Sequence, residues 1–440
     1  MKKLLLSAVL GLLLLGACAG QETASPAAPA EPTVLEFWHA LGGDLGRYFT
    51  VFTNEFNAME THFQVKEVII GSYDELNTAL HASFAAGIPP QIIAGGDGHM
   101  FHRMGLVEPL EPHLSDEFHL DDILGGLMAA LTIDGQMVFA PAYATSQILY
   151  FNKLVLEESG HSVEDLSSWQ TLVAMAPNVM GISTGEGRSI QHVWKPMSGV
   201  GNMVDAVQSA GGSILSADGL TATVNSEYWF DVLESFRGWL HDESIMGIHV
   251  GGQGWEFWYR TMDDWVYGLA LGYTGSPGDY IIALDAVREA IDEGIRNEFG
   301  MTVQPGWRNN PPRPSYSALL YFLPRTGVTE NYAAAARFVE YTITTENTAR
   351  FAIATGYVPV RRSVLYLEAY QEFLENNPYA DIPLIQVDRY AVPQFIDPTG
   401  GAIWTVLADA IAQIQVENAP VQATLDNANE RIQRELDRLD

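Results

Sequence analysis

Hydrophobic and polar residues follow two alternating spacings along the first third of the chain. Apolar residues at every second position predict strands over 33–38 and 64–70, and a short apolar run predicts a third strand within 89–96. Apolar residues three and four positions apart predict helices over 44–59 and 72–84, and the second helix starts with the serine-to-glutamate spacing of a capping box. This β-α-β-α-β order is typical of an α/β fold with a mainly parallel sheet flanked by helices.

Four side chains suited to ligand binding directly follow these strands. Trp38 and His39 come after the first strand, Tyr73 after the second and Asp97 after the third. In open α/β sheets, ligands bind beyond the carboxyl ends of the strands. Aromatic faces cover the C–H side of a sugar, whereas hydroxyl and carboxylate oxygens accept its O–H groups. The pattern therefore predicts a site for a polyhydroxylated ligand at this edge of the sheet.

The amino terminus has the residue order of an export signal. Two lysines precede an apolar stretch over 4–15, and small residues follow it before Cys18. A helix needs about 20 apolar residues to cross a bilayer, so we expect this stretch to be removed. LGAC resembles the lipobox of bacterial lipoproteins, which implies a signal peptide over 1–17 and lipid attachment at Cys18, at the periplasmic or outer face of the membrane. An ordinary signal peptide with a chance cysteine is the alternative.

Composition limits the number of domains and the kinds of partner. Residues 18–32 are rich in alanine and proline and predict a flexible tether. The roughly 400 residues beyond it exceed what one hydrophobic core serves, so two lobes are expected. A formal net charge of −31 argues against nucleic acid as a partner, because phosphate binding needs a basic surface. No metal-binding, P-loop or C-x-x-C pattern occurs, so neither a metal nor a cofactor is predicted.

Several sequence blocks occur in the order of a known family. EFWHALGGD, GSYDEL, AGIPPQIIAGGDG and TGYVPVRRS resemble the family 1 extracellular solute-binding proteins, the capture subunits of bacterial ABC sugar importers. Within that family they are most similar to the branch that binds glycerol 3-phosphate and glycerophosphodiesters. The resemblance implies a monomer that takes a small ligand between two lobes and delivers it, unaltered, to the permease subunits of the importer.

The resemblance also implies how the chain is divided. Each lobe has a mainly parallel sheet flanked by helices, and the chain crosses between the lobes three times. We expect crossings near 140–148, 271–277 and 324–329. The corresponding lobes combine 33–142 with 275–325, and 143–274 with 326–440.

Site residues carried over from the family motifs lie in five blocks of the sequence. They are Tyr73 in GSYDEL, Asp97 in GGDG, Thr145 and Ser146 at the first crossing, Ser276 in GYTGSPG, and Tyr357 in TGYVP. Trp194 matches half of the tryptophan wall that this branch places in its second lobe. Each has a structural alternative, since serine, threonine and aspartate are common in turns. The cluster of Trp255, Trp258 and Trp265 is interpreted as core, because an aromatic stripe at helical spacing is more often buried.

One departure from the branch bears on the ligand. The phosphate-binding branch carries an arginine near its C-terminal region, whereas residues 393–404 contain no cation. A phosphate without that guanidinium loses a bidentate partner. We therefore expect a neutral sugar, oligosaccharide or polyol, with a glycerol phosphate or glycerophosphodiester as the alternative if Arg188, Lys195 or Arg313 substitutes.

Two other classes of function have weaker support. Residues 181–185 fit the G-x-S-x-G pattern of an esterase, but a proline and an asparagine lie where the preceding strand should be. The acidic pairs Asp121-Asp122 and Asp263-Asp264 suggest a glycosidase only superficially, because adjacent residues seldom face one centre. A surface scaffold needs no aromatic and hydroxyl set at a sheet edge. The sequence favours a binding protein over an enzyme.

Overall fold

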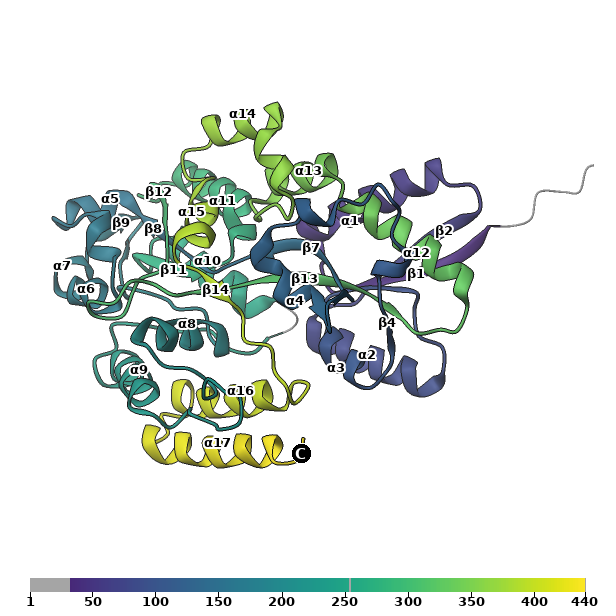
Figure 1. Cartoon of the computed structure of the whole chain (residues 1–440). Coiled ribbons are helices and arrows are strands. Elements are labelled where there is room, and N and C mark those ends of the chain that lie inside the picture. The colour runs from purple at the N-terminus through teal and green to yellow at the C-terminus, as the bar shows by residue number, and fades with distance from the viewer. Residues whose placement is uncertain (1–31, 253–254, 440) are drawn as a thin grey trace, which may run out of the picture.

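The computed structural model describes residues 32–252 and 255–439, which form two lobes side by side (Figure 1). The predicted signal peptide, Cys18 and nearly all of the predicted tether lie outside the described residues. Within the described part of the chain, every helix is too short or too polar to span a bilayer. The two-lobe α/β fold predicted from the sequence is confirmed.

The first lobe is built on a seven-stranded mixed sheet. Its strands are β1 (Thr33–His39), β2 (Phe63–Ile69), β3 (Ile92–Ala94), β4 (Val107–Glu108), β7 (Ala140–Thr145), β13 (Ser315–Pro324) and β14 (Val392–Pro393). Strand β1 runs parallel to β2 and β3, as the alternating pattern predicted, and the long β13 runs antiparallel to β3, β4 and β7. The carboxyl ends of β1, β2 and β3 therefore meet at one edge.

Helices cover both faces of this sheet (Figure 1). They are α1 (Gly43–Met59), α2 (Tyr73–Ala86), α3 (Gly98–Arg103), α4 (Met128–Leu131), α12 (Thr329–Thr342) and α13 (Thr345–Thr355). Alternate residues of β1 enter the core, where the ring of Phe37 contacts Phe49 and Phe338 edge-on. Ser72 caps α2 as its spacing predicted, because its hydroxyl accepts a hydrogen bond from the Glu75 amide at 3.3 Å, but the Glu75 carboxylate accepts from the Ser72 hydroxyl and not from its amide, so only half of the capping box is formed.

The second lobe has a three-stranded sheet that runs antiparallel, which departs from the parallel arrangement expected there. Its strands are β8 (Ile148–Asn152), β11 (Gly272–Gly275) and β12 (Phe299–Thr302). Surrounding helices are α5 (Lys153–Glu158), α6 (Trp169–Ala174), α7 (Ala176–Val179), α8 (Val200–Ala210), α9 (Glu227–Arg237), α10 (Glu256–Val266), α11 (Tyr280–Asp292), α14 (Glu368–Asn376), α15 (Ile382–Arg389), α16 (Ala402–Gln415) and α17 (Val421–Leu436). Alternate residues of β8 are buried in two different hydrophobic cores, one on each face of the sheet.

Short elements complete the chain. They are the hairpins β5 (Thr132–Ile133) with β6 (Gln136–Met137) and β9 (Ser183–Gly185) with β10 (Arg188–Ser189), the 3-10 turns η1 (Glu111–His113), η2 (Leu120–Asp122), η3 (Gly125–Leu127), η4 (Val163–Leu166), η6 (Pro277–Asp279) and η7 (Arg362–Tyr366), and the π-helical turn η5 (Gly238–Asp242). The apolar stripe predicted on the final helix is confirmed, since Leu425, Ala428, Ile432 and Leu436 of α17 are buried.

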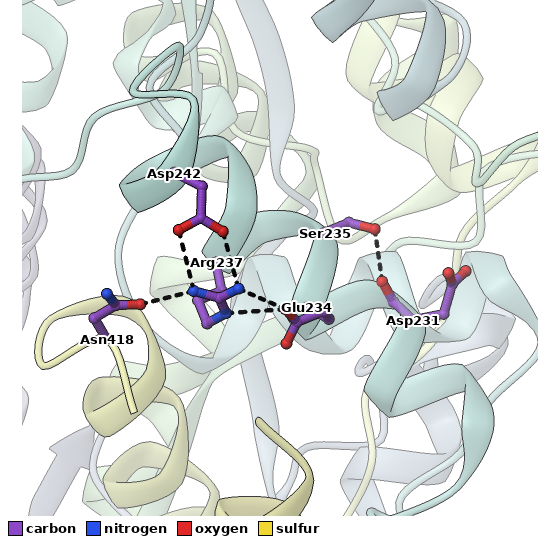
Figure 2. A network of polar contacts seen from close by, with 6 residues as sticks. All are labelled: Asp231, Glu234, Ser235, Arg237, Asp242 and Asn418. Atoms are coloured by element: carbon purple, nitrogen blue, oxygen red, sulfur yellow. Dashed lines mark hydrogen bonds and ion pairs between the residues drawn. The ribbon is translucent and has the colours of Figure 1, made fainter. Parts of the chain in front are cut away.

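A charged network fastens the α16–α17 hairpin to the rest of the second lobe (Figure 2). Arg237 at the end of α9 donates to Glu234 at 2.6 Å, to Asp242 at 2.9 Å and to Asn418, between α16 and α17, at 3.0 Å. The carboxylates hold the pKa of Arg237 above its ordinary value. These contacts are partly exposed, so they orient the hairpin more than they stabilise the lobe.

The structure places the lobe boundaries differently from the predicted ones. Near the first expected crossing, β7 ends at Thr145 in the first sheet and β8 begins at Ile148 in the second. Residues 280–301 belong to the second lobe, since β12 pairs with β8, and residues 332–360 belong to the first core. The chain therefore also passes between the lobes near 303–314 and 361–379, and β14 afterwards returns to the edge of the first sheet before α16. Helical and strand patterns do not specify which sheet a segment joins.

Candidate functional site

A cavity of about 780 Å³ lies where the two lobes meet. The first lobe contributes the backbone after β1 together with Tyr73, Tyr143, Thr145, Ser315, Ser317 and Tyr357. The second lobe contributes Asp205, Trp255, Glu256, Trp258, Tyr259, Ser276, Asp279 and Trp404, and Gln394 lines the cavity from the end of β14 at the edge of the first sheet. A second compartment of about 670 Å³ adjoins it and shares the walls formed by Tyr73, Tyr143, Thr145, Ser317, Gln394 and Trp404. A cavity of this size suits a small organic solute.

A stack of tyrosines forms the floor of the cavity. The rings of Tyr143 and Tyr357 lie parallel with centroids 3.9 Å apart, and the hydroxyls of Tyr143 and Tyr73 are 3.4 Å apart. Tyr357 also packs closely on Gly278 of the second lobe, where an added Cβ would lie 2.3 Å from its ring. Because Gly278 has no side chain, the ring of Tyr357 fits directly against it. Tyr357 therefore contacts the second lobe as well as its own.

Two tryptophans of the second lobe face this floor. Trp255 and Trp258 lie at the start of α10, and the ring of Trp255 meets Tyr73 edge-on at 5.4 Å. The interpretation of these tryptophans as core is right for the fully buried Trp265 and wrong for Trp255, which lines the cavity, whereas Trp258 both packs against the core and lines the cavity. The amphipathic α10 buries Trp265, and the two earlier residues project into the cleft.

Asp279 is a buried carboxylate in the cavity wall. It accepts hydrogen bonds from Nε1 of Trp258 at 2.9 Å, from the amide of Ser276 at 3.1 Å and from the hydroxyl of Tyr273 at 3.2 Å. Burial raises the pKa of Asp279 to about 7, against the lowering effect of these donors. The group therefore changes charge within the physiological pH range.

This raised pKa predicts a pH-dependent stability. The folded protein holds the Asp279 proton more tightly than the unfolded chain, so the group makes unfolding easier as pH rises from about 4 through 7. Between pH 5 and 8 the free energy of unfolding of Asp279→Asn should gain about 2 kcal/mol relative to wild type. Urea titrations at both pH values measure the difference, and a constant difference would contradict the assignment.

A second buried carboxylate, that of Asp205 in α8, bonds to the segment of chain that passes between the lobes before β13. It accepts hydrogen bonds from the amide of Ser315 and from Nε2 of Gln304, both at 2.7 Å, and burial raises its pKa to about 6. Gln386 accepts from the Gln304 amide at 2.7 Å and donates to the hydroxyl of Ser146 at 2.8 Å. The segments that pass between the lobes thus share one buried hydrogen-bond network.

Asp97 lies in the adjoining compartment. Its carboxylate caps α3 by accepting from the amide of Met100 at 3.2 Å, and burial followed by the nearby charge of Asp397 raises its pKa. Asp397 accepts from the amides of Thr399, Gly401 and Trp404. Two carboxylates at this end of the cleft make it unfavourable for an anion.

The structure brings most of the predicted site residues together. Tyr73, Thr145, Ser146, Ser276 and Tyr357 line the main cavity, and Asp97 lines the adjoining compartment. Two of the hydroxyls also form hydrogen bonds within the protein. Ser146 donates to the Ser315 carbonyl at 2.8 Å, and Ser276 accepts from the Gly278 amide at 3.1 Å.

The remaining three predicted residues lie away from both compartments. His39 is fully buried in the first core, where it bonds Glu67 at 2.8 Å and packs on Phe49. Trp38 points to the other face of β1 and donates to Glu36 at 3.1 Å. Trp194 is fully buried and donates to Thr274 at 3.1 Å. The chain beyond His39, from residue 40 to 43, lines the cavity where these rings were expected.

Several lining residues had no prediction. Tyr143 lies two residues before Thr145, within the segment 140–148 expected to cross between the lobes. That position in the sequence could have marked Tyr143 as a candidate site residue. Asp279 follows Ser276 at capping-box spacing, which is a second such signal. Asp205, Ser317, Gln394 and Trp404 reach the cleft only through tertiary packing, and no local pattern marks them.

Cations and metal ligands are scarce around the cleft. Among the described residues, no lysine or arginine lines either compartment. Lys195 is paired with Asp264, Arg188 lies over Tyr267, and Arg313 is exposed outside the cavity. Residues 32–252 and 255–439 contain no cluster of three side chains able to hold a metal ion.

The enzyme-like patterns have structural explanations. Residues 183–185 form a strand of a β-hairpin, so the strand-to-helix turn of an esterase is not formed at this position. Asp122 bonds Ser363 at 2.6 Å, and Asp264 pairs with His249 at 2.8 Å. One carboxylate of each acidic pair thus holds neighbouring segments together.

Comparisons with known proteins agree with this geometry. The chain is 22% identical over 373 residues to the sn-glycerol-3-phosphate-binding periplasmic protein UgpB of Agrobacterium fabrum, which covers 81% of this chain and 80% of that protein. UgpB from Mycobacterium tuberculosis, solved with glycerophosphocholine, has a TM-score of 0.78 and 19% identity over 92% of this chain and 98% of that chain. Maltose-bound MalE3 of T. maritima has a TM-score of 0.77 and 17% identity, over 93% and 100%.

The family match extends over most of the described chain. The model of the bacterial extracellular solute-binding protein family matches residues 52–378. That family and the relatives above are named for binding and not for catalysis. The resemblance stated from the sequence blocks is thus confirmed. This chain belongs to the bacterial extracellular solute-binding protein family.

Proposed function

We propose that this protein captures a sugar, oligosaccharide or polyol between its two lobes and delivers it to the permease subunits of an ABC importer. The observation that carries the proposal is the cavity between the lobes, which is lined by aromatic rings and oxygen-bearing side chains and by no lysine or arginine among the described residues. Aromatic faces pack on the C–H side of a sugar ring, and carboxylates and hydroxyls accept its O–H donors.

Contacts from both lobes provide the binding energy, and they drive closure. The tyrosine stack comes from the first lobe, and Trp255, Trp258 and Asp279 come from the second. A solute contacts both walls only when the lobes are closed, so binding shifts the protein toward the closed form. The permease then distinguishes the loaded protein by its shape, and the solute is released unaltered.

A phosphorylated solute is the alternative. Relatives of this chain are named for sn-glycerol 3-phosphate, and one solved relative holds glycerophosphocholine. Five carboxylates, those of Asp97, Asp205, Glu256, Asp279 and Asp397, line the two compartments, and no lysine or arginine is among the described lining residues. A phosphate there lacks the guanidinium that usually binds it, which favours the neutral class.

Isothermal titration calorimetry with paired small-angle scattering tests the proposal. The panel contains mono- and oligosaccharides, polyols, glycerol 3-phosphate and glycerophosphodiesters. We expect heat and a smaller radius of gyration with at least one neutral compound and none with glycerol 3-phosphate. Binding restricted to phosphate compounds establishes the alternative, and the absence of heat and closure with every compound overturns solute capture of either class.

Attachment to the membrane completes the proposal. The lipobox-like sequence before Cys18 supports a mature monomer that starts at this residue and is tethered by lipid, with 19–32 as a flexible spacer. Mass spectrometry of the protein purified from a bacterial membrane should find a diacylglycerol-modified amino-terminal cysteine. An unmodified amino terminus at another residue would refute the anchor and leave solute capture unaffected.

A further inference from the structure

One short turn contacts both walls of the cavity. The turn η6 (Pro277–Asp279) follows β11 in the second lobe, and the ring of Tyr357 from the first lobe lies directly against its central residue, Gly278. The last residue of the turn, Asp279, bonds to the indole of Trp258, which faces the tyrosine floor from the second lobe. The position of the tryptophan wall relative to the floor therefore depends on three consecutive residues.

The turn itself fixes the position of the Asp279 carboxylate. Oδ2 of Asp279 accepts a hydrogen bond from the amide of Ser276 at 3.1 Å, and the hydroxyl of Ser276 accepts from the amide of Gly278 at 3.1 Å. The hydroxyl of Tyr273 donates to the same carboxylate oxygen at 3.2 Å. Nε1 of Trp258 donates to both oxygens, at 2.9 and 3.0 Å. The indole is thus attached to a carboxylate whose own position is set by the turn.

These hydrogen bonds match the ionised form of Asp279. The amide of Ser276 and Nε1 of Trp258 can only donate, so each needs an acceptor oxygen. A protonated carboxyl has one oxygen that must itself donate, and of these three partners only the hydroxyl of Tyr273 is able to accept. An ionised acceptor also forms the stronger hydrogen bond. Protonation of Asp279 therefore weakens the attachment of the indole.

The other ionisable groups around Asp279 keep their charge state at neutral pH. Facing it are the phenols of Tyr150 on β8, Tyr273 on β11 and Tyr357 of the first lobe, and burial raises the pKa of each phenol above its ordinary value. From α10, the carboxylate of Asp263 acts on the Tyr273 phenol. The hydrogen bonds to Asp279 itself come from neutral donors. A change of charge at this turn near neutral pH is therefore that of Asp279.

We propose that Asp279 is a positioning residue for solute capture, whose ionised carboxylate holds the Trp258 indole against the cavity so that capture is linked to a proton. The inference rests on the proposed function, because it concerns the same cavity, and it adds a regulatory property to it. As the pH falls, Asp279 takes up a proton, the indole is held less firmly, and the solute binds more weakly.

The indole reports its own position without any solute. Near-ultraviolet circular dichroism of the full chain, minus that of Trp258→Phe, gives the signal of this indole. Because burial raises the pKa of Asp279 to about 7, we expect this difference signal to fall by at least about half between pH 8 and pH 6. In Asp279→Asn, the amide oxygen accepts from the indole at either pH, so the difference from the double variant Asp279→Asn/Trp258→Phe should stay constant. A constant signal in wild type, or a falling one in Asp279→Asn, would overturn the inference.

Affinity should follow the same titration. Maltose is the probe for calorimetry, replaced by the tightest-binding neutral compound of the earlier panel if it gives no heat. A group with a pKa of about 7 is about nine-tenths ionised at pH 8 and about one-tenth at pH 6, so wild type should bind about tenfold more weakly at pH 6. Asp279→Asn should change less than about twofold over this range. Equal affinities of wild type at both pH values would show that capture does not depend on the ionised carboxylate.

Two further variants separate positioning from general effects of charge. Asp279→Ala leaves the indole without its acceptor and should bind about tenfold more weakly than wild type at pH 8. Asp285→Asn is the matched control, because Asp285 is an exposed carboxylate of α11 outside the cavity, and it should keep the affinity and the pH dependence of wild type. Thermal melting at pH 6 and pH 8 confirms that each variant is folded. Loss of the pH dependence in Asp285→Asn would assign it to the overall charge and not to the turn.

Failure of this inference is distinguishable from failure of solute capture. Saccharides that bind and close the lobes while the indole signal ignores pH overturn the positioning role alone. A pH-dependent indole signal without heat from any compound of the panel overturns solute capture.

Discussion

Replacing Tyr357 by alanine is expected to weaken solute binding at least about 100-fold while the protein stays folded. The ring stacks on Tyr143 at 3.9 Å, continues the stack to Phe351 and packs on Gly278 across the lobe junction. Its removal deletes part of the cavity floor and the contact that transmits closure to the second lobe, and losses of several kcal/mol are typical of a buried aromatic anchor. Calorimetry with the best solute of the panel measures the loss.

Two companion variants make this prediction specific. Tyr357→Phe keeps the ring and removes the hydroxyl, so we expect a loss of less than about tenfold. Trp38→Ala should bind within about threefold of wild type, because Trp38 lies on the other face of β1 and does not line the cavity. Near-native affinity in Tyr357→Ala, confirmed as folded by circular dichroism, would show that the tyrosine stack is not the floor of the site.

The contrast between Trp38 and Tyr357 shows how far the sequence specifies the site. The alternation along β1 predicted the strand correctly, and its buried residues are Leu35, Phe37 and His39. That same alternation places His39 in the core and turns Trp38 away from the cleft. The cavity lies at the edge of the sheet named from the sequence, but side-chain direction at the end of a strand depends on the residues that pack around it.

Tertiary packing explains the other differences. Tyr357, which was predicted because its block is distinctive, lines the cavity, whereas Asp205 and Trp404 line it from helices with no local sign of a site. Trp255 and Trp258 share an aromatic cluster with Trp265, and only the start of α10 reaches the cleft. The lobe boundaries were misplaced for a related reason, because pairing of β12 with β8 is a long-range contact.

Replacing Trp194 by alanine should cost about 3–5 kcal/mol of unfolding free energy, the range for a fully buried aromatic residue. The ring is fully buried in the second lobe, and an added Cβ on Gly272 would lie 2.4 Å from it. Its Nε1 donates to the hydroxyl of Thr274 at 3.1 Å, so the substitution also leaves a buried hydroxyl without its donor. Urea denaturation followed by circular dichroism measures the change.

Trp258→Ala is the matched control that separates packing from binding. Trp258 is only partly buried and lines the cavity, so its loss should cost less stability than that of Trp194 and more affinity. Trp194→Phe should recover part of the stability, since a ring still fills much of the space. Solute affinity of Trp194→Ala, measured under conditions where it is folded, should stay within about threefold of wild type because the indole does not reach the cavity. A large loss of affinity without a loss of stability would return Trp194 to the binding wall that its sequence position implied.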